Sequence, residues 1–407
     1  MQKKLLLLSL CACVSLLADS DMEALKLELQ QQKETTQKLL SRVESLETTQ
    51  QSSVNTSASF SQNAYLPDIA LILNMSAVGR DVKNSDYANM AIPGFIDAGD
   101  AELPFNANRG VNLNYAEVAM HSQVDPYFEA FAIFHLHPDE FEIEEAYITT
   151  TSLPAGLRVK AGKFRSAFGR LNEKHQHSWN FDAQPIIYKA LFGPDMISDP
   201  GLQLQWVAPT DTYIMAGIDA MQGTNDRSFG DEDPNLIVGY LKSSIDIGDD
   251  LSILGGVSIA HGKTETQDNS NVYGADLTFR EQLGSYSALT WQSEYLQRDK
   301  EINANTTDSQ GGLYTQLVYQ YNNNYSTGIR YDALTKNDTD LSAYNGVNTD
   351  NLDRVTAMLE YKPFPMSRLR LNYSYDRSKI IAGKRQDINT VMLTFNIAAG
   401  AHGAHSY

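Results

Sequence analysis

Cysteine is almost absent from this sequence: the only two, Cys11 and Cys13, lie within the first 18 residues. Those residues begin Met-Gln-Lys-Lys, continue through an apolar stretch and end at Ala18, which is the pattern of a secretory signal peptide. We expect residues 1–18 to be removed on export. The mature chain then has no cysteine, which excludes disulfides and cysteine-ligated metal sites.

Long hydrophobic runs are also missing. No window holds the ~18 consecutive apolar residues that a membrane-spanning helix needs. Basic residues are few. Without the two lysines of the predicted signal peptide, the chain has 30 basic and 50 acidic residues, which gives a net charge of −20. This excess of acid argues against nucleic acid as a partner, since phosphate binding needs a basic surface.

Recognisable catalytic motifs are missing as well. The sequence contains no nucleophile elbow, phosphate-binding loop or HExxH pattern. We therefore predict that the protein is not an enzyme and uses no cofactor.

Residues 19–50 are rich in Glu, Gln, Lys and Leu and contain no Pro or Gly, which predicts a helix. A heptad frame places Leu25, Leu39 and Leu46 on one seam, and this favours a coiled coil that associates with copies of itself. The alternative is a lone amphipathic helix lying against another surface. Residues 51–65 are rich in Ser, Thr, Asn and Gln, a composition typical of a flexible linker.

From residue 66 to residue 407, apolar and polar residues alternate in segments of about ten, and a period of two is that of a β-strand. About 16 such segments occur, mostly with tight turns on one side and longer loops on the other, which predicts an all-β transmembrane barrel of antiparallel strands. The predicted strands are near 67–79, 109–123, 126–136, 140–150, 155–165, 200–208, 212–222, 235–246, 250–262, 271–282, 286–298, 311–322, 325–336, 352–363, 367–379 and 387–397.

Aromatic residues support a membrane barrel over a soluble one. The chain has 21 Tyr but only 3 Trp, and several aromatic residues lie beside the tight turns. Such rings form a girdle where a barrel meets the lipid surface. We therefore expect contact with outer-membrane lipid and a location in the bacterial outer membrane. The proposed girdle consists of Tyr127, Tyr213, Tyr286, Tyr319, Tyr321, Tyr361 and Phe364.

Residues 161–170 (Ala-Gly-Lys-Phe-Arg-Ser-Ala-Phe-Gly-Arg) end a predicted strand and open a long loop. They resemble the strand-to-loop signature of the phosphate-selective porin O/P group, in which a Gly-x-Phe-basic stretch leads to a Phe-Gly pair. This resemblance implies a trimeric barrel of 16 strands with inward-folded loops, and residues 19–50 look like the helical prefix of trimeric porins. The run 171–179, with Gln184-Pro185 and Phe192-Gly193, is more similar to epsilonproteobacteria-type outer-membrane proteins sometimes labelled zinc-regulated receptors.

Two departures from the O/P pattern stand out. Ala167 occupies a position where that group usually has Pro, and residues 398–406, before the terminal Tyr407, are mostly small or His. The second departure weakens the aromatic ending that closes most such barrels. The acidic total also argues against phosphate specificity.

Along each predicted strand the polar residues share one face, which predicts a water-filled lumen lined by charges of both signs. The acidic run from Glu140 to Glu145 and the net charge of −20 predict a weak preference for cations. Most of these groups are expected only to solvate the wall. The pore-lining candidates are Arg158, Lys160, Asp276, Arg280, Glu294, Arg330, Arg354, Glu360, Arg368, Arg370, Glu142 and Glu144.

Four histidines are weak candidates for a metal site, because His135 with His137 and His175 with His177 have spacings that suit zinc or nickel. Both pairs belong to the long-loop side and meet, if at all, at the outer mouth. The alternative, which we favour, is that they are surface loop histidines without a metal.

These observations predict a porin: an outer-membrane barrel, expected to be a homotrimer, that lets small hydrophilic solutes or ions diffuse passively. One alternative is a substrate-specific, zinc-linked uptake channel for metal ions or metal complexes. Another is a structural tether in which the coiled coil holds the barrel to the cell wall. A steady open current in planar bilayers favours the porin, whereas silence favours the tether or a closed receptor.

Overall fold

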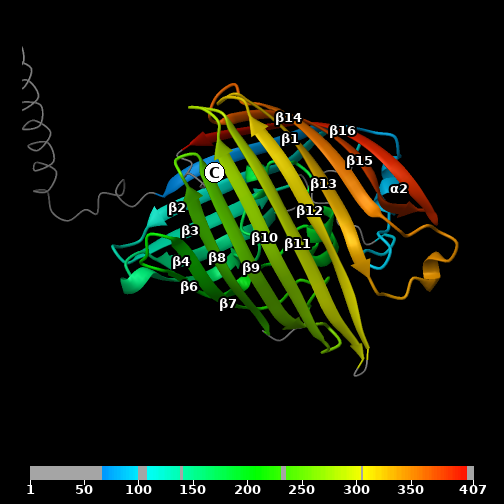
Figure 1. Cartoon of the computed structure of the whole chain (residues 1–407), viewed down its shortest axis with the longest axis horizontal. Coiled ribbons are helices and arrows are strands. Elements are labelled where there is room, and N and C mark those ends of the chain that lie inside the picture. The colour runs from blue at the N-terminus through cyan, green and yellow to red at the C-terminus, as the bar shows by residue number, and fades with distance from the viewer. Residues whose placement is uncertain (1–66, 100–107, 138–140, 231–234, 304–305, 401–407) are drawn as a thin grey trace, which may run out of the picture. The chain divides into compact units, whose positions relative to one another are not determined.

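The predicted barrel is confirmed in a computed structural model that describes residues 67–99, 108–137, 141–230, 235–303 and 306–400. Sixteen antiparallel strands each pair with their neighbours in sequence, and β1 pairs with β16 to close the barrel (Figure 1). The strands are β1 (Asp68–Arg80), β2 (Gly110–Gln123), β3 (Phe128–Leu136), β4 (Phe141–Thr150), β5 (Leu157–Arg165), β6 (Ser198–Val207), β7 (Tyr213–Met221), β8 (Leu236–Ile247), β9 (Leu251–Lys263), β10 (Asn269–Gln282), β11 (Ala288–Asn303), β12 (Thr306–Gln320), β13 (Tyr325–Asn337), β14 (Leu352–Tyr361), β15 (Ser367–Ile381) and β16 (Lys384–Gly400).

Helical segments in the described residues are short and lie in the connections. They are α2 (Asn84–Ala88), α3 (Ile186–Phe192) and the 3₁₀ turns η2 (Pro154–Gly156), η3 (Gln176–Ser178) and η4 (Ser342–Tyr344). Among the described residues, no helix has the length and apolar character that crossing a membrane requires.

The barrel is apolar outside and polar inside. On β14, Val355 and Leu359 are exposed on the outer face, whereas Arg354 and Glu360 are buried on the inner face. Exposed rings beside the tight turns include Tyr127 and Phe364. This reversal of the soluble pattern, with large apolar side chains facing outward on most strands, fits a wall surrounded by lipid.

The strand boundaries agree with the sequence pattern to within about three residues except at one hairpin. β11 and β12 both extend farther than predicted, because the segment expected to be a loop between them continues the ladder as far as Asn303 and Thr306. The predicted signal peptide (1–18), coiled coil (19–50) and linker (51–65) lie outside the described residues.

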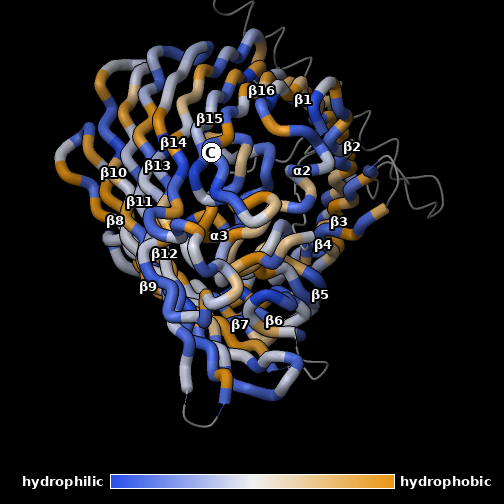
Figure 2. Tube along the Cα trace, turned by 90° about the vertical axis from the view of Figure 1, so that its right-hand side faces the viewer, coloured by the Kyte–Doolittle hydropathy of each residue, from blue (hydrophilic) through white to orange (hydrophobic). Residues whose placement is uncertain are grey.

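Residues of two long connections fold into the barrel from the long-loop end, namely residues 166–197 and the described residues 81–99 between β1 and β2. Residues 166–197, the inserted loop, join β5 to β6 and carry α3, which lies inside the ring of strands and contacts β11, β12 and β13 (Figure 2). Nearer the mouth, Ala91 forms a two-way backbone bridge with Ile380 of β15. The main hydrophobic core is therefore inside the lumen, where apolar residues of the inserted loop are packed.

Candidate functional site

The segment that resembles the porin signature turns the chain into the lumen. Phe164 and Phe168 are fully buried and carry the chain from β5 into the apolar cluster. The Ser166 hydroxyl donates to Asp219 of β7 over 2.6 Å. Gly169 adopts a positive φ of 59°, and an added Cβ would lie 2.0 Å from a carboxylate oxygen of Glu294. Glycine is therefore required where the loop meets the wall.

Buried charges hold the far part of the inserted loop. Asp182 lies 3.0 Å from the guanidinium of Arg370 and accepts a hydrogen bond of 2.7 Å from Thr394. The guanidinium of Arg354 donates to the backbone oxygen of Gln184 over 2.6 Å. These contacts use lumen-facing groups of β14, β15 and β16 as anchors. The loop is thus fixed by both apolar packing and charge-assisted hydrogen bonds.

A polar cavity of about 450 Å³ lies between the inserted loop and the wall formed by β9 to β14. The tight turn at 322–324 contributes to its lining, which places the cavity toward the short-turn end of the barrel. Its ionisable lining groups are five bases and one acid, namely Arg170, Lys174, Arg280, Arg330, Lys362 and Glu360.

A second group of ionisable side chains lies on the opposite wall, where β2, β3 and β4 meet the inserted loop. It is built by a β-bulge: Ile133 of β3 pairs with Glu145, but the next residue, Phe134, pairs with Ile143. The extra residue, Glu144, disturbs the alternation of β4. As a result Glu144 and Glu145 are both buried, although adjacent strand residues normally face opposite sides. We call Glu117, His135, Glu144, Glu145, His175 and His177 the His/Glu cluster.

The ring nitrogens and carboxylates of the His/Glu cluster are in direct contact. His135 Nε2 lies 3.1 Å from Glu117 Oε2 and 2.5 Å from Glu144 Oε2. His175 Nε2 lies 2.8 Å from Glu145 Oε2, while its Nδ1 lies 3.3 Å from Glu144 Oε2. His177 Nδ1 lies 3.2 Å from Glu117 Oε2. The cluster therefore links three strands to the loop.

The electrostatics of the two loop histidines differ. Burial alone would lower the pKa of His175, but the carboxylates of Glu144 and Glu145 outweigh burial and raise that pKa well above its usual range. For His177, burial dominates over the attraction of Glu117 and lowers the pKa. The cluster thus favours positive charge at the position of His175.

Comparison with known proteins identifies the architecture. A family model described as "Putative beta-barrel porin-2, OmpL-like" matches residues 129–402. The chain belongs to this family. An uncharacterised protein of Aquifex aeolicus (strain VF5) is 39% identical over 386 residues, which cover 86% of this chain and 81% of the relative.

Solved structures resemble this OmpL-like porin in fold. The outer membrane channel DcaP of Acinetobacter baumannii has a TM-score of 0.54 at 13% identity, covering 82% of this chain and 97% of that one. An anion-selective porin from Comamonas acidovorans has a TM-score of 0.53 at 10% identity, covering 82% and 99%. At such identities the likeness concerns the fold alone. Together with the lipid-facing wall and polar lumen, the family places this porin in the bacterial outer membrane as a channel for passive diffusion.

The pore-lining candidates lie in several different environments. Arg280, Arg330 and Glu360 border the cavity, whereas Arg158 is exposed and lies outside its lining. Most of the others contact the inserted loop or are buried near it, so a water-filled wall does not describe them. Arg354, Arg370 and Glu294 form hydrogen bonds with the inserted loop, and Glu144 belongs to the His/Glu cluster. Lys160 lies over the ring of Phe164, and Asp276 is buried on β10. Glu142 lies near Lys163, and Arg368 lies near Glu360.

The expectation that the histidines lie on the surface was wrong for His135 and His175. His135 and His175 are buried, because the loop carrying His175 folds into the lumen and brings it to the wall that carries His135. Sequence reasoning missed Glu117 and Asp182, which anchor this loop. Glu117 is one of the alternate residues of β2 that face the lumen, and this alternation was a usable signal. Nothing in the sequence indicates the partners of Asp182.

Proposed function

We propose that small hydrophilic solutes and ions pass the inserted loop through the cavity that separates it from β9 to β14. The observation that carries this proposal is the polar lining of that cavity at the level where the loop narrows the barrel. Diffusion through such a channel needs no chemical step, so the proposal includes no enzymatic activity. The inserted loop acts as the constriction.

The charges around this cavity favour anions. Its lining carries five bases against one acid, and one of the bases, Arg330, lies 3.1 Å from Asp332. The acidic run that predicted cation preference lies elsewhere. Its residues Glu144 and Glu145 belong to the His/Glu cluster, where Arg165 donates a hydrogen bond to Glu144. Local charges in a narrow passage act more strongly than distant ones, because salt screens beyond about 8 Å. We therefore propose a weak anion preference.

Reversal potentials across a KCl gradient test this proposal. The wild-type channel should favour chloride at low salt. The double variant Arg170→Gln/Lys174→Gln removes two lining charges and should shift the reversal potential toward potassium. The control, Arg109→Gln/Lys384→Gln, removes one Arg and one Lys from exposed positions and should leave it unchanged. Potassium preference in the wild type, or equal shifts in both variants, would show that this cavity does not set the selectivity.

Assembly as a homotrimer is part of the same proposal, supported by the heptad pattern of residues 19–50. The likeness to the phosphate-selective O/P group stays a resemblance, and the basic lining of the cavity is the feature here that agrees with anion transport. A zinc-linked uptake channel or a structural tether predicts no steady current. Recordings from purified protein in planar bilayers therefore separate these alternatives from the porin.

A further inference from the structure

We infer that the His/Glu cluster is a binding site for one divalent transition-metal ion of the zinc type, with Glu117, His135, Glu144 and His175 as its ligands. This inference is independent of the proposed solute path. It rests on the geometry, charge and outer contacts of the cluster.

The candidate ligand atoms are close to the spacing of a zinc site. Zinc binds nitrogen and oxygen at about 2.0–2.1 Å, so tetrahedral ligands lie about 3.3 Å apart. Here His135 Nε2 lies 3.1 Å from Glu117 Oε2, and His175 Nδ1 lies 3.3 Å from Glu144 Oε2. His135 Nε2 lies only 2.5 Å from Glu144 Oε2, so this pair must separate to admit an ion. The ligand atoms of Glu117, Glu144 and His175 all lie within 4.8 Å of one another. Small side-chain movements are enough to surround an ion.

The charge of the cluster matches a divalent cation. Glu117, Glu144 and Glu145 contribute three negative charges, and Arg165, bonded to Glu144 Oε1, contributes one positive charge. With neutral imidazoles the buried net charge is −2. Buried charge of this size must be compensated: protons on the imidazoles do so in the metal-free cluster, and one divalent ion does so when it displaces them.

The outer contacts prepare His175 to act as a ligand. Glu145 Oε2 lies 2.8 Å from His175 Nε2, where it accepts a hydrogen bond from an Nε2–H group. In the neutral ring this leaves Nδ1, 3.3 Å from Glu144 Oε2, as the ligand atom. Carboxylates that orient a metal-bound histidine in this way are typical of metal sites. The β-bulge is what turns Glu145 inward for this role. Tyr115 adds a stacked contact on His135, with ring centroids 4.6 Å apart.

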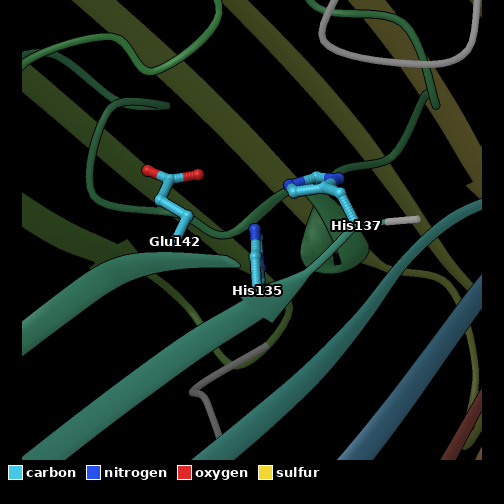
Figure 3. Close-up of side chains that lie close together, drawn as sticks. All are labelled: His135, His137 and Glu142. Carbon is cyan, nitrogen blue, oxygen red and sulfur yellow. The ribbon is translucent and has the colours of Figure 1, made fainter. Parts of the chain in front are cut away.

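The donor set selects the class of ion. Two imidazoles and two carboxylates suit Zn²⁺ and its first-row neighbours, whereas Ca²⁺ and Mg²⁺ prefer oxygen donors alone. A competing arrangement shares His135: Figure 3 shows His137 and Glu142 beside it, next to the connection between β3 and β4. That group has Lys163 3.6 Å from Glu142, and Glu142 is more exposed than the carboxylates of the inner set. The inner set is therefore the one assigned.

Metal titration of the purified full-length chain in detergent, after stripping with a chelator, tests the site. Co²⁺ should bind once per chain with the intense visible absorption of four-coordinate cobalt, and Zn²⁺ should displace it. His175→Gln should abolish this binding, whereas Glu145→Gln should weaken it by about 10- to 100-fold because it loses only an outer contact. His137→Gln is the matched control and should bind normally.

Heat-dependent migration on gels shows whether each variant remains a folded barrel. Absence of stoichiometric binding to folded wild type would overturn the inference, and so would unchanged binding by folded His175→Gln. Loss of binding in His137→Gln alone would assign the ion to the hairpin group instead. Because these measurements need no current, a failed metal site leaves the proposed solute path untouched.

Discussion

Lys174 illustrates how a single residue of the inserted loop responds to its surroundings. Burial, together with the nearby charge of Arg170, lowers the pKa of Lys174 to about 8, although Glu173 opposes the shift. The ammonium group is therefore mostly protonated at pH 7 and mostly neutral at pH 9. Because Lys174 borders the cavity, the proposed path loses a positive charge over this range.

We predict that chloride preference decreases as the pH rises from 7 to 9. Reversal potentials measured at both pH values check this. Lys174→Gln should start with a lower preference and show a smaller pH response, whereas Lys384→Gln, an exposed control, should respond as the wild type does. An undiminished pH response in Lys174→Gln would assign the titration to another group.

At the scale of elements, the strands followed from the sequence because each needs only its own alternation of apolar and polar residues. β14 is an example, with Val355 and Leu359 outward and Arg354 and Glu360 inward. The site did not follow in the same way. A β-bulge breaks the period of two at Glu144, and the path of the inserted loop depends on contacts between residues far apart in sequence, as between Asp182 and Arg370.

The inserted loop depends on one close approach at Gly169. In Gly169→Ala, the added methyl group would clash with Glu294 and the side chain would occupy an unfavourable φ, at a cost of about 1–3 kcal/mol. We predict that this end of the loop moves away from the wall and that single-channel conductance changes and becomes noisier. Gly79→Ala on β1 is the control, because the nearest atom to its added Cβ is 4.0 Å away. Identical recordings from both variants would show that the Gly169 contact does not position the constriction.

For the whole molecule, net charge and local charge give opposite expectations. The full sequence has a net charge of −18, yet five of the six charged residues that line the cavity beside the inserted loop are bases. Screening limits the reach of the total charge to about 8 Å at physiological salt, so the narrow passage is governed by its own lining.

Self-association is the remaining property of the whole molecule, and residues 19–50 carry its clearest sequence signal. If these helices form a coiled coil, Leu39→Asp/Leu46→Asp places charges in an apolar seam, which opposes association. We predict a homotrimer for the full chain in mild detergent and a larger monomer fraction for this variant, as measured by light scattering after size-exclusion chromatography. Glu34→Asp/Glu47→Asp, which lies off the seam and keeps its charge, is the control.

The barrel wall also has large exposed apolar side chains that can contact a neighbour. A wild-type monomer would refute the trimer, whereas a trimer that persists unchanged in the variant would place the association in the barrel wall.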